Sequence, residues 1–314
     1  MPKYSFNTIY IVGWNRGYTQ YYSEVMKNNF GTPVDPAFSE FDPIKYLIQK
    51  ARPKGIKIIL WFEFGFSYRY KNETNSEIER RKPHWISINR QGAPVEKNGF
   101  YWLNAFDPEV QKFMIDLISE AVHKYDIDGI QGDDRLPALP SSAGYNRGIV
   151  EDFFNQYSYS PSDDKDTLWV QFRADKLTDF LGNLYKHLKS IRPDLIISMS
   201  PSIYPWSLNE YLQDWPRWIS DGLVDELLPQ VYRRNLAAYQ STLNNNVLKF
   251  IPDHFLNRLF PGILLKINDY YTDDQLLFQK ISFNRSKGIK GEVFFYFEGI
   301  KKRPKFFKGY SKAF

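Results

Sequence analysis

The segment 126–135, with the sequence DIDGIQGDDR, constrains the fold of this chain more than any other stretch. A short apolar run ends there in two adjacent aspartates and an arginine. The segments 109–125 before it and 169–188 after it have the amphipathic pattern of helices. A strand between two helices is typical of a parallel α/β sheet or barrel, in which the carboxyl ends of the strands carry the functional groups.

The rest of the chain repeats this alternation. Helices are expected over 42–50, 109–125, 169–190, 215–221 and 272–287. Apolar, β-rich runs predict further strands over 7–14, 57–64, 195–201, 225–232, 261–267 and 292–298. Seven strands alternating with helices, without a repeat or a linker, predict a single TIM-type (β/α) barrel over residues 1–314. Long loops are expected at 65–104 and 136–166.

The amino end of this predicted barrel is short. The usual barrel has eight strands, and only six residues precede the run 7–14. We therefore expect the first strand and helix of the barrel to be missing. The strands 7–14 and 292–298 would then have open edges, and unpaired edges invite pairing with another chain. This predicts a gap or a homodimer contact at that edge.

Composition excludes several kinds of chemistry. The chain has no cysteine, which excludes disulfides, thiolate metal sites and cysteine nucleophiles. Its four histidines are not spaced for zinc, and no phosphate-binding glycine loop is present. Asp133 and Asp134 could hold Mg²⁺ or Ca²⁺, but further oxygen ligands are not evident, so neither a metal nor another cofactor is expected. No apolar run is long enough to span a membrane.

The formal net charge is +5, and much of the positive charge lies in the basic tail 301–314. A basic tail can bind nucleic acid, an anionic polymer or a membrane, but it is more often only a solvated end. No nucleic-acid partner is expected. Aromatic residues make up 18% of the chain, which is enough for some rings to line a sugar-binding cleft as well as the core.

Side chains alternate along a strand, and this alternation selects the residues that point into the barrel. Near the carboxyl ends of the strands, the selected residues are Trp61, Glu63, Gln131, Asp133, Gln230, Tyr232, Lys266, Tyr296 and Glu298. The loop after the first strand adds Trp14, Asn15 and Arg16 at the same end. We expect this set to line the mouth of the barrel.

Several carboxylates around one mouth, without a thiol, suit glycoside hydrolysis. That reaction needs a carboxylic acid to protonate the leaving oxygen and a carboxylate as nucleophile or base. Asp133, beside Asp134 and Arg135, is expected to stay ionised and to act as nucleophile or base. Glu63 lies among aromatic residues, and burial would favour its protonated form, so it is the expected acid. Glu298 fits the role of acid equally well.

Seven segments, in order along the chain, resemble the glycosyl-hydrolase-like family 10 barrels, and in particular their cyanobacterial-type branch. They are 6–23, 55–66, 102–118, 125–135, 212–218, 227–233 and 293–299. The resemblance implies a TIM-type barrel that hydrolyses a polysaccharide, with peptidoglycan and other cell-envelope glycans as candidate substrates. It also implies that the family's recurrent cleft positions fall on Glu63, Asn104, Asp133, Asp134, Gln230, Tyr232 and Glu298.

The chain departs from the family pattern at two positions of the central segment. The family usually has an aromatic residue where Gly132 stands, and an aromatic residue or histidine where Arg135 stands. Arg135 places a cation against the acid pair, which could change substrate preference or mark a lost activity. Family members also begin with a strand and helix upstream of residue 6. If a signal precedes them, the protein is expected in the periplasm or outside the cell, and otherwise in the cytoplasm.

The leading expectation is a glycoside hydrolase that acts on a carbohydrate polymer. A non-catalytic glycan-binding protein, which keeps the cleft and its aromatic residues, is the alternative. A third hypothesis is an assembly or scaffold protein that uses the basic tail and the open edge.

Overall fold

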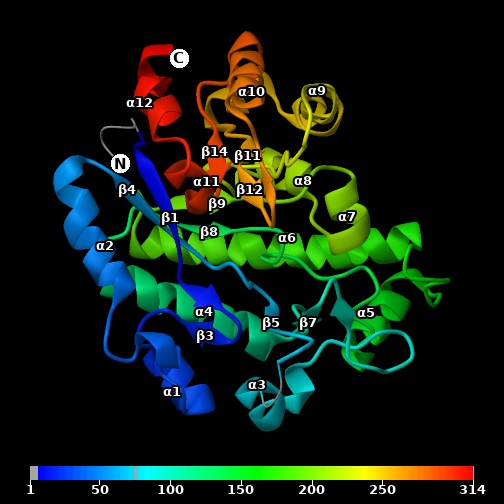
Figure 1. Cartoon of the computed structure of the whole chain (residues 1–314). Coiled ribbons are helices and arrows are strands. Elements are labelled where there is room, and N and C mark those ends of the chain that lie inside the picture. Colours follow the sequence, from blue (N-terminus) through cyan, green and yellow to red (C-terminus); the bar gives the residue numbers. More distant parts are fainter. Residues whose placement is uncertain (1–5, 74–75, 314) are drawn as a thin grey trace.

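The computed structural model describes residues 6–73 and 76–313, and parallel strands lie at its centre (Figure 1). Five of them form one sheet in the order β1–β4–β8–β9–β10, and two more pair as β11–β14. Single parallel bridges, Leu227–Leu259 and Gln230–Gly262, continue the arrangement from the β10 end toward β11. The bounds of these strands are β1 Thr8–Val12, β4 Lys57–Trp61, β8 Gly129–Gly132, β9 Ile196–Met199, β10 Glu226–Leu227, β11 Gly262–Leu264 and β14 Val293–Phe295.

Helices surround these strands, with α4 and α6 side by side along one flank and α9 and α10 packed together on another (Figure 1). The predicted α/β architecture of TIM type is therefore confirmed. The helices are α1 Glu24–Phe30, α2 Pro43–Ala51, α3 Glu77–Arg81, α4 Pro108–Lys124, α5 Arg147–Tyr157, α6 Thr167–Ile191, α7 Trp206–Tyr211, α8 Trp215–Ser220, α9 Leu236–Asn246, α10 Asp274–Ser286, α11 Phe297–Lys301 and α12 Pro304–Ala313. Within the described part of the chain, none of them is long and apolar enough to cross a bilayer.

The helices begin where the sequence signals place them. The Asp42 carboxylate, just before Pro43, accepts a hydrogen bond from the Lys45 amide at 2.8 Å, and this caps α2. Asp107 caps α4 in the same way, through the Glu109 amide at 2.8 Å. Because these caps are local, the predicted helices 42–50 and 109–125 are present to within one residue.

Side-chain contacts across the interior show that the sheet curves into a barrel. Tyr10 of β1 and Glu226 of β10 lie on opposite end strands of the five-stranded sheet, yet the Tyr10 hydroxyl donates to Glu226 Oε1 at 2.9 Å. Ile59, Leu228 and Leu264 are buried but lie outside the main core cluster between the strands and the helices. Alternation puts these three residues on the same sides of their strands as Trp61, Gln230 and Lys266, which are predicted to point inward. A curved sheet with a filled interior explains their burial and their separation from the main cluster.

A cluster of aromatic rings covers the break between β1 and β14. Among the described residues no strand pairing joins these two strands, so the predicted gap in the ladder is present. The Phe6 ring packs 6.0 Å from the Phe294 ring, and the Phe307 ring of α12 lies 5.2 Å from Phe6 and 5.1 Å from Phe294. The basic tail is therefore not merely a solvated end, because its helix α12 packs Phe307 against this edge (Figure 1). The homodimer contact stays a prediction.

Replacing Phe307 with alanine should destabilise the chain by about 3–5 kcal/mol, because a fully buried ring leaves a cavity between α12 and β14. Thermal unfolding followed by circular dichroism would measure the change. Phe297→Ala is the control, since this ring is 50% exposed and its loss should cost within about 0.5 kcal/mol. Equal effects of the two substitutions would show that α12 does not hold the edge.

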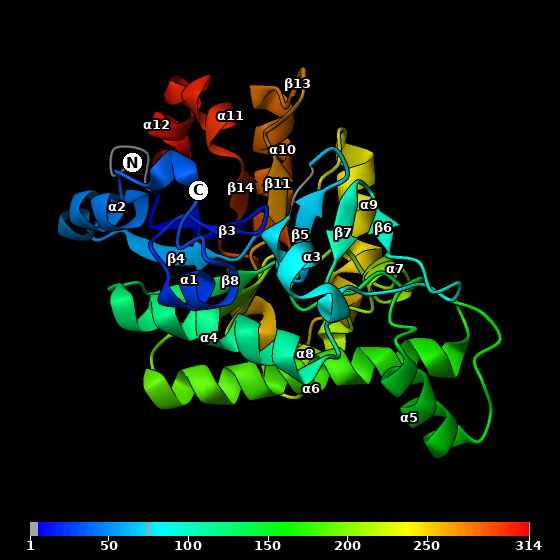
Figure 2. The same cartoon turned by 90° about the horizontal axis from the view of Figure 1, so that it is seen from below.

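Two long excursions leave the carboxyl ends of β4 and β8, and both contain helices or strands of their own. The first forms an antiparallel sheet in the order β5–β7–β6, together with α3 (Figure 2). The second contains α5, and the buried Arg173 of α6 holds it by donating to the Ser141 and Ala143 carbonyls at 2.6 and 2.5 Å. The excursion strands are β5 Ser67–Tyr70, β6 Glu96–Lys97 and β7 Phe100–Trp102.

Short hairpins follow β1 and β11 at the same end of the barrel. They are β2 Trp14–Asn15 with β3 Tyr18–Thr19, and β12 Lys266–Ile267 with β13 Tyr270–Tyr271. Single 3-10 turns complete the connections, at Pro36–Phe38, Arg52–Lys54, Pro83–Trp85, Leu248–Phe250 and Asp253–Arg258. The excursions and hairpins therefore surround the mouth into which β4 and β8 deliver their terminal side chains.

Candidate active site

Three carboxylates meet one guanidinium at the mouth of the barrel. Arg135 Nη2 lies 3.0 Å from Asp133 Oδ2 and 3.8 Å from Glu63 Oε1, and Arg135 Nη1 lies 3.1 Å from Asp134 Oδ1. The Asp133 side chain is 2% exposed, whereas those of Glu63 and Asp134 are 22% and 28% exposed. The structure therefore brings together Glu63, Asp133, Asp134 and Arg135, as the sequence predicts.

The register of two parallel strands sets this arrangement. Trp61 of β4 is paired with Gln131 of β8, so Glu63 and Asp133 each lie two residues beyond a matched pair. The Asp133 carboxylate then accepts hydrogen bonds from the Arg135 amide at 2.9 Å, from Arg135 Nη2 at 3.0 Å and from Trp61 Nε1 at 3.1 Å. All three neighbours of the Asp133 oxygens are donors, and Trp61 is a direct contact of the carboxylate.

Burial raises the pKa of Asp133 well above its ordinary value, and the Asp134 and Glu63 charges act in the same direction. Arg135 opposes this rise but does not overcome it. The expectation that the guanidinium keeps the Asp133 pKa low is therefore wrong in direction, because desolvation of a nearly enclosed carboxylate outweighs one ion pair. Burial also raises the pKa of Glu63, against the opposing effects of Arg135 and Asn15, as expected.

Aromatic side chains that the sequence reasoning did not select form the walls of the site. The Phe295 ring stacks on Tyr232 with centroids 5.3 Å apart and meets Trp61 edge-on at 6.4 Å. On the other side, the Arg135 guanidinium lies 4.8 Å from the centre of the Phe100 ring. Burial and the nearby Asp134 charge raise the pKa of Tyr211 to about 12. In the sequence, only the neighbouring aromatic residue Trp206 could have pointed to Tyr211 at the end of α7, and this is not a specific signal.

Gln213 is a further residue that the sequence reasoning did not single out. Its buried side chain donates to the Asp133 carbonyl at 2.8 Å and to the Pro137 carbonyl at 3.2 Å. It thereby fixes the turn that carries the acid pair. The available signal was its place in the segment 212–218, which carries part of the family resemblance.

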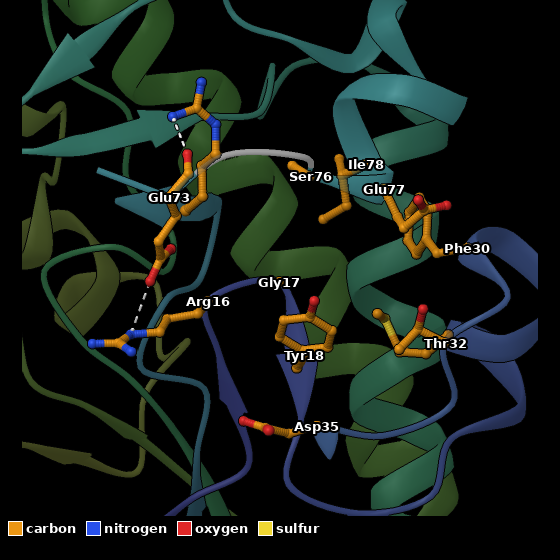
Figure 3. A pocket seen from close by; sticks show the side chains of 12 residues that line it. Arg16, Gly17, Tyr18, Phe30, Thr32, Asp35, Glu73, Ser76, Glu77 and Ile78 are labelled. Carbon is orange, nitrogen blue, oxygen red and sulfur yellow. Dashed lines mark hydrogen bonds and ion pairs between the residues drawn. The ribbon is translucent and has the colours of Figure 1, made fainter. Parts of the chain in front are cut away.

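The hairpin β2–β3 links the carboxylates to a neighbouring pocket. Asn15 Nδ2 donates to Glu63 Oε2 at 2.5 Å. The next residue, Arg16, turns away and pairs with Glu73 at 3.2 Å, where it lines a cavity of about 390 Å³ together with Tyr18 and Asp35 (Figure 3). This cavity lies beside the carboxylates and does not contain them. Asn15 is therefore a direct contact of the site, and Arg16 belongs to its margin.

Replacing Asn15 with alanine should shift the alkaline limb of the kcat/KM profile to higher pH. The Asn15 hydrogen bond lowers the pKa of Glu63, so its loss lets a general acid at Glu63 stay protonated to higher pH. A pH–rate series on a released reducing sugar would measure the limb. Asn245→Ala, on the exposed face of α9, is the control and should leave it in place. If the alkaline limb of the profile does not move in Asn15→Ala, the pKa of Glu63 does not determine that limb.

Four residues of the predicted set are held by other contacts. Trp14 is fully buried and donates to the Gly65 carbonyl at 3.0 Å. Gln131 donates to Ser198 at 3.2 Å within the barrel, and Gln230 donates to the Ser200 carbonyl at 3.0 Å. Asn104 is buried in the turn before α4, where its side chain accepts from the Phe106 amide at 3.3 Å. These contacts give each of the four a positioning role in the scaffold.

Glu298 does not lie where the sequence predicted it. The strand β14 ends at Phe295, and Glu298 lies in α11, where its 47% exposed side chain pairs with Lys301 at 2.7 Å. The predicted inward set of this strand is also reversed, because Phe295 faces Trp61 and Tyr232 while Phe294 packs on α12. Aromatic residues occupy both faces of this strand, so alternation could not identify the inner one. Tyr296 and Lys266 lie farther out on the rim, with the Lys266 nitrogen 5.9 Å from the Tyr296 ring.

The two departures from the family pattern, Gly132 and Arg135, lie in the same turn and depend on each other. A Cβ atom at Gly132 would lie 2.2 Å from the Leu136 carbonyl oxygen, so no side chain fits there. The turn after Asp133 folds over the space that an aromatic ring would need, and this places Arg135 among the carboxylates. Among the described residues, no group of three or more acidic or histidine side chains has an arrangement that could hold a metal ion.

The fold places the chain among TIM-type (β/α) barrels. The glycoside hydrolase domain of PgaB (BpsB) from Bordetella bronchiseptica superposes with a TM-score of 0.73 at 13% identity, covering 97% of this chain and 88% of that one. Alpha-L-fucosidase isoenzyme 2 from Paenibacillus thiaminolyticus superposes with a TM-score of 0.66 at 14% identity, covering 99% of this chain and 44% of that one. These likenesses concern the fold.

The chain belongs to the glycosyl hydrolase-like 10 family, whose model matches residues 1–255. Among curated relatives, glycosyl hydrolase YngK of Bacillus subtilis is 21% identical over 299 residues, which is 84% of this chain and 54% of the relative. Glycosyl hydrolase DigH of Escherichia coli is 22% identical over 222 residues, which is 63% of this chain and 48% of the relative. The chain spans about half the length of these relatives. The predicted family is therefore confirmed.

Proposed function

We propose that this chain hydrolyses glycosidic bonds of a polysaccharide through the carboxylates of Glu63 and Asp133. The observation that carries the proposal is the meeting of one buried and one partly buried carboxyl group, at the ends of neighbouring barrel strands, around one guanidinium. Glycoside hydrolysis needs two carboxyl groups with different protonation states. Membership of the glycosyl hydrolase-like 10 family supports the same reaction class.

The hydrogen-bond partners divide the two roles. Asp133 accepts from three donors, and hydrogen bonds to a carboxylate favour its charged form. Glu63 accepts a single hydrogen bond from Asn15, so it can take up a proton with less loss. Glu63 then protonates the leaving oxygen, and Asp133 attacks the sugar or activates water. Asp134, more exposed and held by Arg135, contributes negative charge beside the developing cation.

The contacts of Arg135 limit the separation of the two carboxyl groups, and this limit is compatible with both retention and inversion of configuration. Because Arg135 Nη2 contacts both Asp133 Oδ2, at 3.0 Å, and Glu63 Oε1, at 3.8 Å, these oxygens cannot lie farther apart than the two distances together. Retaining enzymes place their carboxyl groups about 5–5.5 Å apart, and inverting enzymes about 6.5–9.5 Å apart. Proton NMR of the first-formed sugar anomer would identify the course.

The substrate proposed is a carbohydrate polymer of the cell envelope, with peptidoglycan glycan strands among the candidates. The aromatic walls formed by Trp61, Phe295 and Tyr232 support a sugar polymer, since sugar faces pack on aromatic rings. Reducing-end release from a panel of purified glycans, with peptidoglycan strands included, tests the proposal. Release from at least one polymer is expected, and no release from any would count against hydrolysis.

A non-catalytic glycan-binding role is the second candidate, and Arg135 is the observation that favours it. Its guanidinium contacts all three carboxylates, which neutralises part of the charge that catalysis would use. Binding of a glycan that is never cleaved would select this role. The third hypothesis, a scaffold using the tail, loses support because α12 packs Phe307 inward. Export of the protein stays a prediction, which fractionation of its native cells would test.

A further inference from the structure

A cationic aromatic surface borders the mouth on the side of β11 and β14. It comprises the rings of Tyr270, Tyr271 and Tyr296 and the cations Lys266, Lys302 and Arg234. The hairpin β12–β13 supplies two of the rings and Lys266. Arg234 precedes α9, Tyr296 lies between β14 and α11, and Lys302 follows α11, and these elements gather at one end of the sheet formed by β11 and β14 (Figure 1). These residues are far apart in sequence, and the barrel brings them to one rim.

The cations of this surface lie over rings and have no carboxylate partner. Lys302 Nζ is 4.1 Å from the centre of the Tyr271 ring, and Lys266 Nζ is 5.3 Å from the same ring. Arg234 lies 5.1 Å from the Tyr270 ring. Across residues 6–73 and 76–313, no ion pair joins any of these three cations to an acid. Their charge is therefore available to an anionic ligand.

The acids nearby do not cancel this charge. Glu298 is paired with Lys301 at 2.7 Å, and Asp274 is paired with Arg303 at 2.9 Å. Asp269, in the turn of the β12–β13 hairpin, and Asp273, which caps α10 by accepting from the Leu276 amide at 2.7 Å, can offset two of the three cations. The surface keeps a net positive charge, although the neighbouring mouth carries three carboxylates.

This surface is continuous with the candidate active site. Trp61, which donates to Asp133 at 3.1 Å, meets the Phe295 ring, whose centroid lies 5.2 Å from that of Tyr296. The Tyr296 ring in turn lies beside Lys266. A polymer bound at the carboxylates can therefore extend over these rings without leaving the protein surface.

We propose that the cationic aromatic surface binds the carboxylate groups of an acidic polysaccharide, and that such a polymer is the substrate class. This inference rests on the proposed glycan hydrolysis. Sugar rings pack on the accessible parts of these tyrosine rings, of which Tyr296 is the most exposed at 37%, while carboxylates along the chain pair with Lys266, Lys302 and Arg234. A neutral glycan would leave these cations without partners. A nucleic acid could use the same rings and cations, but the path from the surface leads to a carboxylate pair suited to glycosidic bonds.

Binding to matched polymers tests the proposal. Polygalacturonate, alginate and hyaluronate would each be compared with their carboxyl-reduced, neutral forms by isothermal titration calorimetry at low salt. Asp133→Asn protein would be used throughout, so that no substrate is cleaved. We expect at least one acidic polymer to bind about tenfold or more tightly than its neutral form, and this preference to weaken as salt is raised.

Two charge-matched variants separate this surface from the net charge of the protein. The triple variant Lys266→Gln, Lys302→Gln, Arg234→Gln should lose about tenfold or more of the affinity for the acidic polymer. The control Lys45→Gln, Lys50→Gln, Lys54→Gln removes three exposed cations on and just after α2 and should change affinity by less than about twofold.

Three results would overturn the inference. They are equal binding of acidic and neutral polymers, equal loss of affinity in the two triple variants, and binding of single-stranded poly(dT) as tight as that of the best acidic polysaccharide. The last result would identify a nucleic-acid surface. Failure of the wild-type protein to cleave any glycan would count against hydrolysis alone, because the binding measurements do not depend on cleavage.

Discussion

Asp133→Asn should reduce glycan hydrolysis by about 10²–10⁴-fold, the range expected when a carboxylate that acts in the transition state is lost. Asparagine has nearly the same shape as aspartate. The hydrogen bond that the Gln213 side chain donates to the main-chain carbonyl of residue 133 should therefore persist. The amide, however, has one acceptor oxygen where Asp133 has two, and it cannot serve as nucleophile or base. Reducing-end release from the polymer that the wild type cleaves best would measure the change.

The control for this substitution is Asp126→Asn. Asp126 lies in the same segment, but its side chain is 73% exposed and pairs with Arg52 on the far side of β8. Its loss should leave hydrolysis within about twofold of wild type, because exposed ion pairs contribute little. Glycan binding by Asp133→Asn should persist, which would separate loss of chemistry from loss of fold. Hydrolysis that survives in Asp133→Asn would remove Asp133 from the mechanism.

Part of this site could be predicted from sequence because two strands have an unambiguous alternation. In β8, Gln131 lies between Ile130 and Gly132, and Asp133 continues the side of the strand on which Gln131 lies. In the segment 58–64, which begins in β4, the run of apolar residues is broken only at Glu63. The polar side chain can then face only one way, toward the mouth. Parallel pairing of β4 with β8 brings Glu63 and Asp133 together once the barrel forms. Strand order and helix positions followed from equally local signals, such as the Asp42 cap of α2.

Alternation failed where both faces of a strand are aromatic. In β14, Phe294 and Phe295 are equally able to face the interior or α12, and the choice depends on Trp61 and Phe307, which lie far away in sequence. The same ambiguity led to the wrong placement of Glu298, because the strand ends at Phe295 and a helix follows. Tertiary packing determines both which phenylalanine faces the interior and where the strand ends. The pattern of residues along the strand carries no information about that packing.

The contact between Arg135 and Glu63 also could not be predicted from the sequence. Arg135 could be placed beside Asp133 and Asp134 because it follows them directly. Its contact with Glu63 requires that the turn after Asp133 fold back over Gly132, which depends on the close approach of the Leu136 carbonyl. That contact makes Arg135 the shared partner of three carboxylates, and a large effect on stability is expected from its loss.

Arg135→Met should destabilise the folded chain by about 3–5 kcal/mol at neutral pH, because it leaves buried carboxylates without their cation. Arg135 lowers the pKa values of Asp133 and Glu63, which burial already raises, so its removal raises both further. Below the ordinary carboxyl values, near 4, both the folded and the unfolded chain carry these protons. As pH rises toward the raised folded values, the unfolded chain releases its protons first, and stability falls.

The signature of this effect is its pH dependence. Thermal unfolding of wild type and Arg135→Met at pH 5, 6.5 and 8 should give the smallest difference in stability at pH 5 and the largest at pH 8, since protonated carboxyls no longer need the guanidinium. Arg217→Met is the matched control, because Arg217 pairs with Asp221 on the surface with a 54% exposed side chain, and its loss should cost at most about 1 kcal/mol at every pH. A deficit in Arg135→Met that does not change with pH would mean that Arg135 acts through packing on Phe100 rather than through charge. Hydrolysis gained by the variant at low pH, where one carboxyl is protonated without Arg135, would show that the guanidinium restrains the reaction rather than supporting it.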